Sequence, residues 1–425
     1  MPLPPANALE MPTDWVICQI GAREHYAVAR GFAEAGNLHC LITDAWVPPG
    51  HWTERISQSL RERYHPALSE AQVRSWTASL IRFELSARMR KVTGWPLIIS
   101  RNAWFQQRAV QALAALAKAG LGSGDSRPAV FAYSYAALEP FRYARQRGWK
   151  TILGQIDPAI VEERIVADVC KRSPQLAANW QPAPASYWQA WHDECGLANQ
   201  IVVNSQWSKE ALIQAGVEAF KIHIIPLAYE PHPEADACVR TYPQRFSPTR
   251  PLRVLFLGQL TPRKGMDAIL TALSRLLDEP IEWWFVGPLS TSIPADLKRH
   301  PKTKWFGHVP RSHAARFYRD ADVFLFPTHS DGFGLTQLEA ASWHLPMIAS
   351  RFCGAVVEHD RSGIVLPEVT PQAIAEALLR CVENPQLLAA LASAAIPWSE
   401  FSVGMIAEHF ENLAIEPPLP QSTPA

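Results

Sequence analysis

The sequence lacks long apolar runs, an excess of charge of either sign and any ordered cysteine pattern. No stretch reaches 18 consecutive apolar residues, so no transmembrane helix is expected. Forty basic residues balance 40 acidic ones, which argues against a generally basic nucleic-acid-binding protein. The seven cysteines are odd in number and contain no Cys-x-x-Cys pair, which argues against a disulfide framework and a structural zinc site.

The first 15 residues contain neither a basic segment nor an apolar one, so no signal peptide is expected and a cytoplasmic location is the default prediction. Proline and tryptophan, by contrast, are abundant, with 36 and 16 residues, which suggests many loops and aromatic surfaces around a ligand cleft. The 425 residues are 48% hydrophobic and 19% charged, which is typical of a globular protein with two or three domains.

Short apolar runs alternate with helical patterns, which predicts the α/β class. The runs are nearly continuous, so helices should cover both faces of each sheet. Ligands of such sheets bind at the carboxyl ends of the strands, and two facing doubly wound domains would therefore enclose a ligand cleft. The predicted strands are residues 15–20, 38–43, 129–132, 150–155, 200–204 and 222–226, then 252–257, 281–286, 303–306, 322–326 and 346–349.

Residues 228–250 interrupt this pattern with four prolines and no sustained period, which indicates an interdomain linker. The chain therefore divides into an N-terminal domain at residues 1–235, a linker at 236–250 and a C-terminal domain at 251–395. A helix is predicted at 396–412, and the Pro-rich tail at 413–425 is expected to be disordered.

The loop LGQLTPRKG (257–265) follows a predicted strand and opens a helix. It places Arg263 and Lys264 in the first helical turn, where free N–H groups and a partial positive charge add to the two cations. Such a site suits a diphosphate. The alternative is a solvated basic helix start. The loop is not a Walker A motif, because no Ser or Thr follows the lysine.

A second loop, SDGFGLTQLE (330–339), also follows a predicted strand. Its glycines allow a close approach of the backbone to a ligand. Asp331 lies in the loop and Glu339 about two turns into the next helix, a spacing that suits two separate sets of hydroxyl groups. The alternatives are a helix-capping role for Asp331 and a surface position for Glu339.

Together these loops resemble the retaining glycosyltransferases of family GT4, which have the GT-B fold of two facing Rossmann-like domains. The resemblance covers residues 200–410 well and the N-terminal half only loosely. The family's Glu-x7-Glu motif is present here as Asp331-x7-Glu339. Other matching blocks, in the family's order and spacing, are ANQIVVNSQWSKEAL, KIHIIP, VLFLGQLTPRKG, WFVGPL, KWFGHVP and YRDADVFLFPT.

The resemblance implies that the C-terminal domain binds a nucleotide-sugar donor. Arg263 and Lys264 would hold the diphosphate, Glu339 would bind the ribose, and Asp331 would face the transferred sugar and the distal phosphate. The closing helix of the family would cross back to the N-terminal domain. Further implied donor contacts are Gly258, Gln259, Val309 near the base, and the backbone of Gly332, Phe333, Gly334 and Leu335.

This chain departs from the family pattern at several positions. Asp331 replaces the usual first glutamate, and Gln259 replaces a frequent arginine. The loop near the acceptor often holds a histidine in the family but reads LGQIDP here, which leaves two candidates, Gln155 and Asp157. Asp157 could orient or deprotonate an acceptor hydroxyl, or cap the following helix. Gly21, His25 and Tyr26 are candidates for lining an acceptor pocket, with ordinary first-turn positions as the alternative for the last two.

Residues 50–128 form a helical insertion whose segment 54–108 has ten basic and four acidic residues, a net charge of +6. With Trp95, Trp104 and Phe105 among the cations, the segment is a candidate for peripheral contact with an anionic membrane. A solvated helical subdomain is the alternative.

Metal-ligand spacing is not found in the sequence. His308 and His313 lack a partner at metal spacing, and we interpret Asp320 and Asp322 as part of a strand start, not as a metal-binding pair. The expected activity is therefore metal-independent. The resemblance implies retaining transfer of a hexosyl group, without a cofactor, to a glycan, a lipid-linked saccharide or a small molecule. The rivals are a nucleotide-sugar epimerase or hydrolase of the same fold and a non-catalytic sugar- or partner-binding scaffold.

Overall fold

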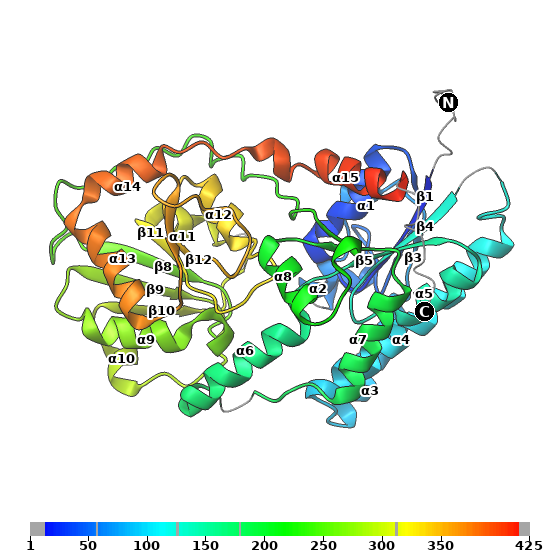
Figure 1. The fold of residues 1–425 in the computed structure, drawn as a ribbon, viewed down its shortest axis with the longest axis horizontal. Coiled ribbons are helices and arrows are strands. Elements are labelled where there is room, and N and C mark those ends of the chain that lie inside the picture. The colour runs from blue at the N-terminus through cyan, green and yellow to red at the C-terminus, as the bar shows by residue number, and fades with distance from the viewer. Residues whose placement is uncertain (1–12, 57, 125–126, 178–179, 311–312, 416–425) are drawn as a thin grey trace, which may run out of the picture.

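The computed structural model describes residues 13–56, 58–124, 127–177, 180–310 and 313–415. These residues form two domains, each with a parallel sheet flanked by helices (Figure 1). The strand orders are β3-β2-β1-β4-β5-β6-β7 and β10-β9-β8-β11-β12-β13. In each domain the second and third strands extend the sheet on one side of the first strand, and the fourth strand returns to its other side. The prediction of two doubly wound α/β domains is confirmed.

The N-terminal sheet is buried because its strands are nearly continuous apolar runs that helices cover on both faces. Its strands are β1 (Thr13–Gln19), β2 (Leu38–Thr43), β3 (Val73–Arg74), β4 (Arg127–Tyr133), β5 (Lys150–Gly154), β6 (Gln200–Val203) and β7 (Ile222–Ile224). Its helices are α1 (Ala27–Glu34), α2 (Gln58–Arg61), α3 (Thr77–Met89), α4 (Gly94–Lys118), α5 (Leu138–Gln146), α6 (Ala159–Arg172), α7 (Ala185–Leu197) and α8 (Gln206–Gln214), with 3-10 turns η1 (Arg23–Tyr26), η2 (Trp52–Arg55), η3 (Pro66–Leu68), η4 (Pro174–Leu176) and η5 (Ala219–Lys221).

The C-terminal domain repeats the plan with strands β8 (Leu252–Leu257), β9 (Ile281–Val286), β10 (Thr303–Gly307), β11 (Val323–Phe326), β12 (Met347–Ser350) and β13 (Gly363–Leu366). Its helices are α9 (Met266–Arg275), α10 (Ala295–Arg299), α11 (Ala315–Asp320), α12 (Thr336–Ser342), α13 (Pro371–Glu383) and α14 (Pro385–Ala392), with 3-10 turns η6 (Pro262–Lys264) and η8 (Trp398–Phe401). A last helix, α15 (Val403–Ile415), follows and is three residues longer than the predicted end at residue 412.

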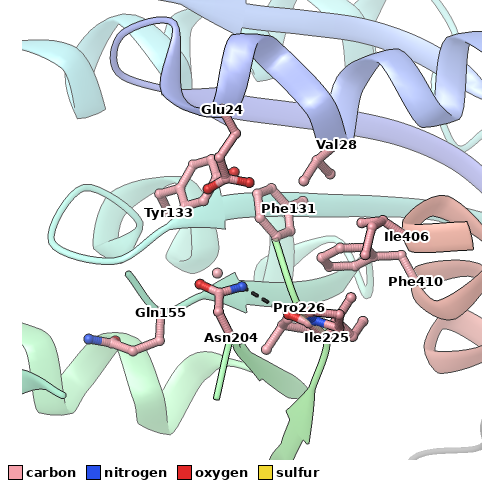
Figure 2. A pocket seen from close by; sticks show the side chains of 12 residues that line it. Glu24, Val28, Phe131, Tyr133, Gln155, Asn204, Ile225, Pro226, Ile406 and Phe410 are labelled. Carbon is pink, nitrogen blue, oxygen red and sulfur yellow. Dashed lines mark hydrogen bonds between the residues drawn. The ribbon is translucent and has the colours of Figure 1, made fainter. Parts of the chain in front are cut away.

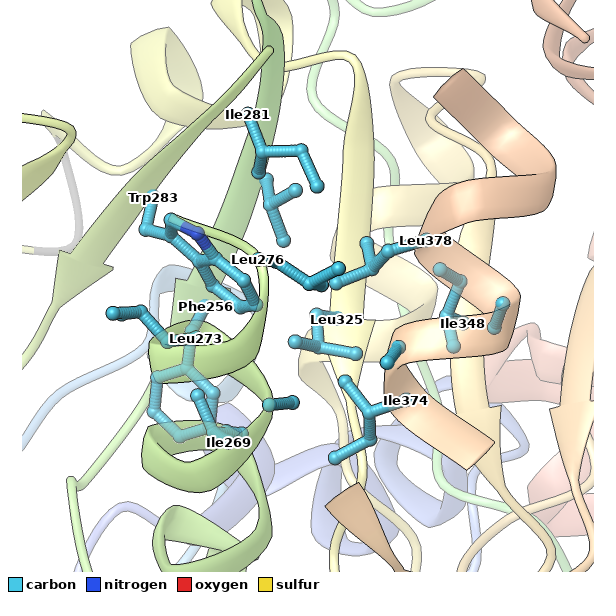
Figure 3. Close-up of a cluster of buried hydrophobic side chains, with 14 of the residues drawn as sticks. Phe256, Ile269, Leu273, Leu276, Ile281, Trp283, Leu325, Ile348, Ile374 and Leu378 are labelled. Atoms are coloured by element: carbon cyan, nitrogen blue, oxygen red, sulfur yellow. The ribbon is translucent and has the colours of Figure 1, made fainter. Parts of the chain in front are cut away.

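Helices α9 and α13 cover one face of the C-terminal sheet (Figure 3). Their apolar side chains recur on one side of each helix, as a 3.6-residue period requires. Ile269 and Leu273 of α9 and Leu378 of α13 meet Leu325 of β11, and all four are fully buried. This core holds the carboxyl ends of β8 and β11 in fixed positions, and the two candidate donor loops leave the sheet there.

Two segments besides the linker also reach from one domain to the other. Helix α15 packs against α1, and its Phe410 ring lies edge-on to Trp15 of β1 at 6.4 Å between centroids. In the opposite direction, Leu176 at the end of η4 is buried in the C-terminal core, where its carbonyl accepts a hydrogen bond of 2.7 Å from Thr291. The α6–η4 segment therefore reaches from the N-terminal domain to the C-terminal one (Figure 1).

The insertion packs against the N-terminal sheet more closely than its composition suggested. Phe105 is 1% exposed, so its ring is not available to a membrane and that part of the interpretation is wrong, whereas Trp104 is half-buried against the same hydrophobic cluster. Arg63 and Arg101 both bind the buried Asp44 at 2.9 Å. Within the described part of the chain, no helix combines the length and the apolar character that a membrane span requires.

Candidate functional site

The two cations of the first loop lie in the 3-10 turn η6, not in the first turn of α9 as predicted. Gly265 separates the turn from the helix with a φ of 80°. A Cβ at this position would lie 2.0 Å from the carbonyl oxygen of Pro327, so only glycine fits. This close approach brings Arg263 and Lys264 beside the loop that follows β11.

Asp331 lies between these cations. Its carboxylate forms an ion pair with Lys264 and lies 3.4 Å from the guanidinium of Arg263, which also donates to the Ser330 carbonyl at 3.0 Å. Burial alone would raise the pKa of Asp331, but the two cations hold it below its ordinary value. The structure thus brings three predicted residues, separated by 67 positions in the sequence, into one charged cluster.

Asp331 does not cap a helix. Helix α12 begins at Thr336, and Leu335 occupies its N-cap position. The capping alternative is therefore wrong. The backbone N–H of Asp331 donates to the carbonyl of Phe352 at 2.9 Å, which fixes the loop while the carboxylate faces the cations.

Glu339 lies in the first turn of α12, not two turns into it. Its Oε2 accepts a hydrogen bond of 2.7 Å from the hydroxyl of Tyr318 in α11. A carboxylate that already binds one hydroxyl has the chemistry to bind ribose hydroxyls as well. Val309 is half-buried and packs against the same side of the domain as Tyr318 and Leu335.

Gly332 brings the two domains into contact. A Cβ at this position would lie 2.3 Å from the carbonyl oxygen of Ile156 in the N-terminal domain. Ser208 at the start of α8 donates to the Gly332 carbonyl at 3.2 Å, and Trp207 donates to Ser330 Oγ at the same distance. The predicted donor loop therefore contacts the predicted acceptor loop, as a reaction between groups bound to the two domains requires.

The other predicted donor positions surround this contact. Phe333 is 4% exposed and its side chain packs in the C-terminal core, which leaves only its backbone to a ligand. Gly334 has a φ of 84° just before α12. Gly258 follows β8 directly, and Gln259 lines a large cavity described below.

Asp157 contacts the start of the following helix, as one of its two predicted roles requires, and its role toward an acceptor stays a prediction. Its Oδ1 accepts hydrogen bonds from the Tyr135 hydroxyl at 2.5 Å and from the backbone N–H of Ala159 in the first turn of α6 at 3.0 Å. Gln155 is 2% exposed; it donates to Asp157 at 3.1 Å and accepts from Trp191 at 2.9 Å. Gln155 therefore positions Asp157, whereas its direct contact with an acceptor stays a prediction.

The loop after β1 places its candidates in different environments. Tyr26 is fully buried, with its ring 5.4 Å from that of Trp46, so its assignment to an acceptor pocket is wrong. His25 is exposed and borders a cavity of about 130 Å³ together with Leu335 of the other domain. Gly21 donates its N–H to Asp44 at 3.0 Å, and the Arg63 guanidinium lies where a side chain would be.

Glu24 is a further residue of this loop, which the sequence analysis did not identify. Glu24, His25 and Tyr26 have φ values of 51°, 50° and 60°, a strained conformation that other contacts must maintain. Figure 2 shows the Glu24 carboxylate beside Tyr133, above a small cavity closed by Phe410 of α15. Burial raises the pKa of Glu24 to about 7, against the effects of Arg23 and Tyr133. Nothing in the sequence around Glu24 indicates its contact with a ring of β4.

A third cavity, of about 360 Å³, opens between α6, α7 and the loop after β8. Asp157, Glu162 and Arg263 line it, and the Glu162 carboxylate lies 3.5 Å from the Arg263 guanidinium. Burial raises the pKa of Glu162 to about 8, although Arg263 opposes the shift. Glu162 was also not identified, because a glutamate in the first turn of a helix is an ordinary feature of surface helices.

The described residues contain no group of three or more His, Cys, Asp or Glu side chains that could hold a metal ion. Asp322 instead forms a bidentate ion pair of 2.7 Å with Arg250 and accepts the backbone N–H of Arg253. This carboxylate therefore ties the linker to the C-terminal sheet.

The comparisons with known proteins agree with this geometry. Residues 251–384 match the family model "Glycosyl transferases group 1". The amylovoran biosynthesis glycosyltransferase AmsK of Erwinia amylovora is 28% identical over 50% of this chain and 56% of its own length. A D-inositol 3-phosphate glycosyltransferase of Streptomyces bingchenggensis is 25% identical over 54% of this chain and 55% of its own. The match thus spans about half the length of these relatives.

The solved structures support the fold. HepE of Anabaena, crystallised with UDP, has a TM-score of 0.58 at 16% identity over 95% of this chain and 99% of its own. Sucrose-phosphate synthase of Thermosynechococcus elongatus has a TM-score of 0.59 at 17% identity over 95% and 98%. The resemblance to GT4-like glycosyltransferases is confirmed. The two domains accordingly form a GT-B fold, with the Arg263–Lys264–Asp331 cluster where they face each other.

Proposed function

We propose that this chain is a retaining glycosyltransferase that moves a sugar from a nucleotide-diphosphate-sugar to a hydroxyl group of an acceptor. The observation that carries the proposal is the cluster of Arg263, Lys264 and Asp331 at the cleft, where the ends of β8 and β11 meet. Two cations beside a carboxylate match a donor whose phosphates are anionic and whose sugar presents hydroxyl groups.

The donor phosphates would take over the cations that now bind carboxylates. Arg263 is shared between Glu162 and Asp331, and both bonds exceed 3.3 Å, so a phosphate can draw the guanidinium away at little cost. Lys264 also lies 4.7 Å from the face of the Phe326 ring, which limits its orientation. A cation held in this way needs no reorganisation as charge develops on the leaving diphosphate.

The reaction would proceed on one face of the sugar. The bond between the anomeric carbon and the phosphate oxygen breaks, and the acceptor oxygen bonds to that carbon from the same side. The acceptor proton passes to a phosphate oxygen of the departing nucleoside diphosphate. Lys264 and Arg263 stabilise the leaving group, and Asp331 accepts hydrogen bonds from the sugar, whose ring gains positive charge.

Further assignments follow from position in the cleft. Glu339 would bind the ribose hydroxyls and Val309 the base. Asp157, with its carboxylate held by Tyr135, would orient the acceptor hydroxyl. The two cations replace a metal ion in this scheme, so we propose that the transfer is metal-independent.

UDP-sugars are the first donors to test, because HepE, whose fold this chain shares, binds UDP-glucose. The experiment measures nucleoside diphosphate release from UDP-, GDP- and ADP-sugars, with and without a mixture of glycoside acceptors. Release that depends on an acceptor supports a transferase, and release into water alone supports the rival hydrolase. A chain that binds donors without release would be a scaffold, and the proposal would be wrong.

Peripheral membrane contact remains a proposal, now assigned to different residues. Leu85 and Met89 at the end of α3 and Ile98 in α4 are 51%, 79% and 41% exposed, close in sequence to Arg88 and Lys91. Apolar side chains beside cations are the pattern of interfacial binding. A soluble acceptor would need no such surface, so vesicle binding also informs the class of acceptor.

A further inference from the structure

The cavity between α6, α7 and the loop after β8 is separate from the residues assigned to ribose and base. Neither Glu339 nor Val309 lines it, and it meets the donor cluster only through Gln259, Arg263 and their neighbours in the loop. Ser290 of the loop after β9 also lines it, and the remaining lining residues come from the N-terminal domain. The cavity therefore lies beside the donor phosphates, on the side from which an acceptor can reach the transferred sugar.

Five aromatic residues line the N-terminal wall. Tyr135 and Tyr187 stack with centroids 5.0 Å apart, and Trp95 lies 4.9 Å from Tyr187 at an angle of 57°. The indole N–H of Trp95 donates to the Gln181 carbonyl at 3.0 Å. This hydrogen bond fixes the orientation of the Trp95 ring at the cavity wall. The aromatic residues that line it are Trp95, Tyr135, Trp180, Tyr187 and Trp188.

Carboxyl groups form the polar part of the wall. Asp157, Glu162 and Glu163 line the cavity against a single guanidinium, that of Arg263. Three carboxyl groups thus face one cation, and the proposed donor uses that cation. Ionised carboxylates only accept hydrogen bonds, so they favour a ligand rich in hydroxyl groups and repel a phosphate.

We propose that this cavity is the acceptor subsite and that it takes the ring of an uncharged sugar. One face of a pyranose ring consists of C–H groups and packs on aromatic faces, whereas its rim carries hydroxyl groups that donate to carboxylates. The volume of about 360 Å³ lies at the lower end of the usual range for ligand pockets, which suits one or two sugar units.

The position of Asp157 connects this subsite to the reaction. Its carboxylate borders the cavity and is held by Tyr135, one of the stacked rings. A sugar on the aromatic wall would direct a hydroxyl toward Asp157 and the donor phosphates. The inference rests on the proposed transfer, but sugar binding to the cavity can be measured without a donor.

The rival is an anionic acceptor at the loop after β1. Arg63 and Arg101 lie there near Gly21, and both form an ion pair with the single carboxylate of Asp44. Together the three side chains carry one net positive charge. A phosphorylated acceptor, such as an inositol phosphate, would bind these groups. The two sites thus differ in the charge of the acceptor that each admits.

The test measures binding of methyl glucoside, methyl galactoside and methyl mannoside to the full chain by saturation-transfer NMR, without donor, beside glucose 6-phosphate and inositol 3-phosphate. We expect at least one methyl glycoside to bind more tightly than both phosphates. Trp95→Ala should weaken that binding about tenfold, the scale for losing an aromatic anchor. Trp95→Tyr, which keeps a ring, should restore most of it.

Trp52→Ala is the matched control, because Trp52 is 66% exposed and does not line the cavity. It should leave glycoside binding unchanged. Preference for the phosphates, absence of binding by every methyl glycoside, or equal loss in the Trp95 and Trp52 variants would overturn the inference. UDP-glucose binding measured in parallel distinguishes this failure from failure of the donor site, since a chain that binds donor but no glycoside contradicts only the acceptor proposal.

Discussion

Lys264 offers the sharpest test of the donor site, because it has a structural partner and a proposed catalytic role. It pairs with Asp331, and both side chains are largely buried, at 13% and 14% exposure. Lys264→Met keeps the length of the side chain and removes its charge. The variant separates a cation that serves the leaving group from one that only neutralises Asp331.

The expected cost in stability follows from the geometry. Removing one partner of a buried ion pair usually costs about 3–5 kcal/mol. Arg263 remains 3.4 Å from Asp331 and compensates in part, so we expect the free energy of unfolding to fall by about 2–3 kcal/mol. The double variant Lys264→Met/Asp331→Asn leaves no unpaired charge and should recover most of this loss.

Activity should respond differently from stability. Loss of a fixed donor to a developing anion costs about 10²–10³ in turnover, so Lys264→Met should lower kcat by that factor. The double variant should be stable and remain inactive. Lys304→Met is the matched control, because Lys304 is 47% exposed, lies in the same domain and has its own partner, Glu282. Urea unfolding and nucleoside diphosphate release measure the two effects. Wild-type turnover in Lys264→Met, or restored turnover in the double variant, would refute the phosphate role.

Four further predictions test other parts of the site. Glu339→Gln should raise the donor KM more than it lowers kcat, because ribose contacts act before and during the reaction alike; initial rates against donor concentration check this, and a selective loss of kcat would contradict it. Gly332→Ala should lower turnover and stability together, since the new Cβ would lie 2.3 Å from the Ile156 carbonyl and separate the domains; unchanged turnover would show that the contact is dispensable. Activity should survive EDTA, and a loss restored by manganese or magnesium would reverse the proposal of metal independence. Met89→Asp should weaken sedimentation with anionic vesicles without affecting turnover on a water-soluble acceptor, and equal sedimentation of both proteins would exclude this surface.

The sequence alone determined most of the order of strands and helices and the residues of the predicted donor loops, but it missed the two edge strands β3 and β13. Near-continuous apolar strands and helical crossovers are local patterns, so they could be read along the chain. Arg263, Lys264, Asp331 and Glu339 could be selected in the same way, because each lies in a short loop or helix start that follows a buried strand. The family resemblance was recognised from sequence blocks that include these loops.

Tertiary structure decided which side chains face a ligand. Tyr26, Gln155 and Phe105 belong to residue types that also bind sugars, yet all three are buried, because each lies on the side of its element that meets the core. Conversely, Glu162 became a cleft residue only through its approach to Arg263, 101 positions away (263 − 162).

The proposed acceptor cavity shows most clearly what tertiary structure adds to the sequence. The aromatic wall combines rings from α4, the loop after β4 and α7, which no sequence window contains together. Their assembly depends on how the insertion and the α6–η4 segment pack, and packing is a property of the whole chain. Local sequence therefore identified the residues of the predicted donor loops, because each loop directly follows a buried strand. Only the folded chain brought those loops together and formed the cavity that we propose for the acceptor.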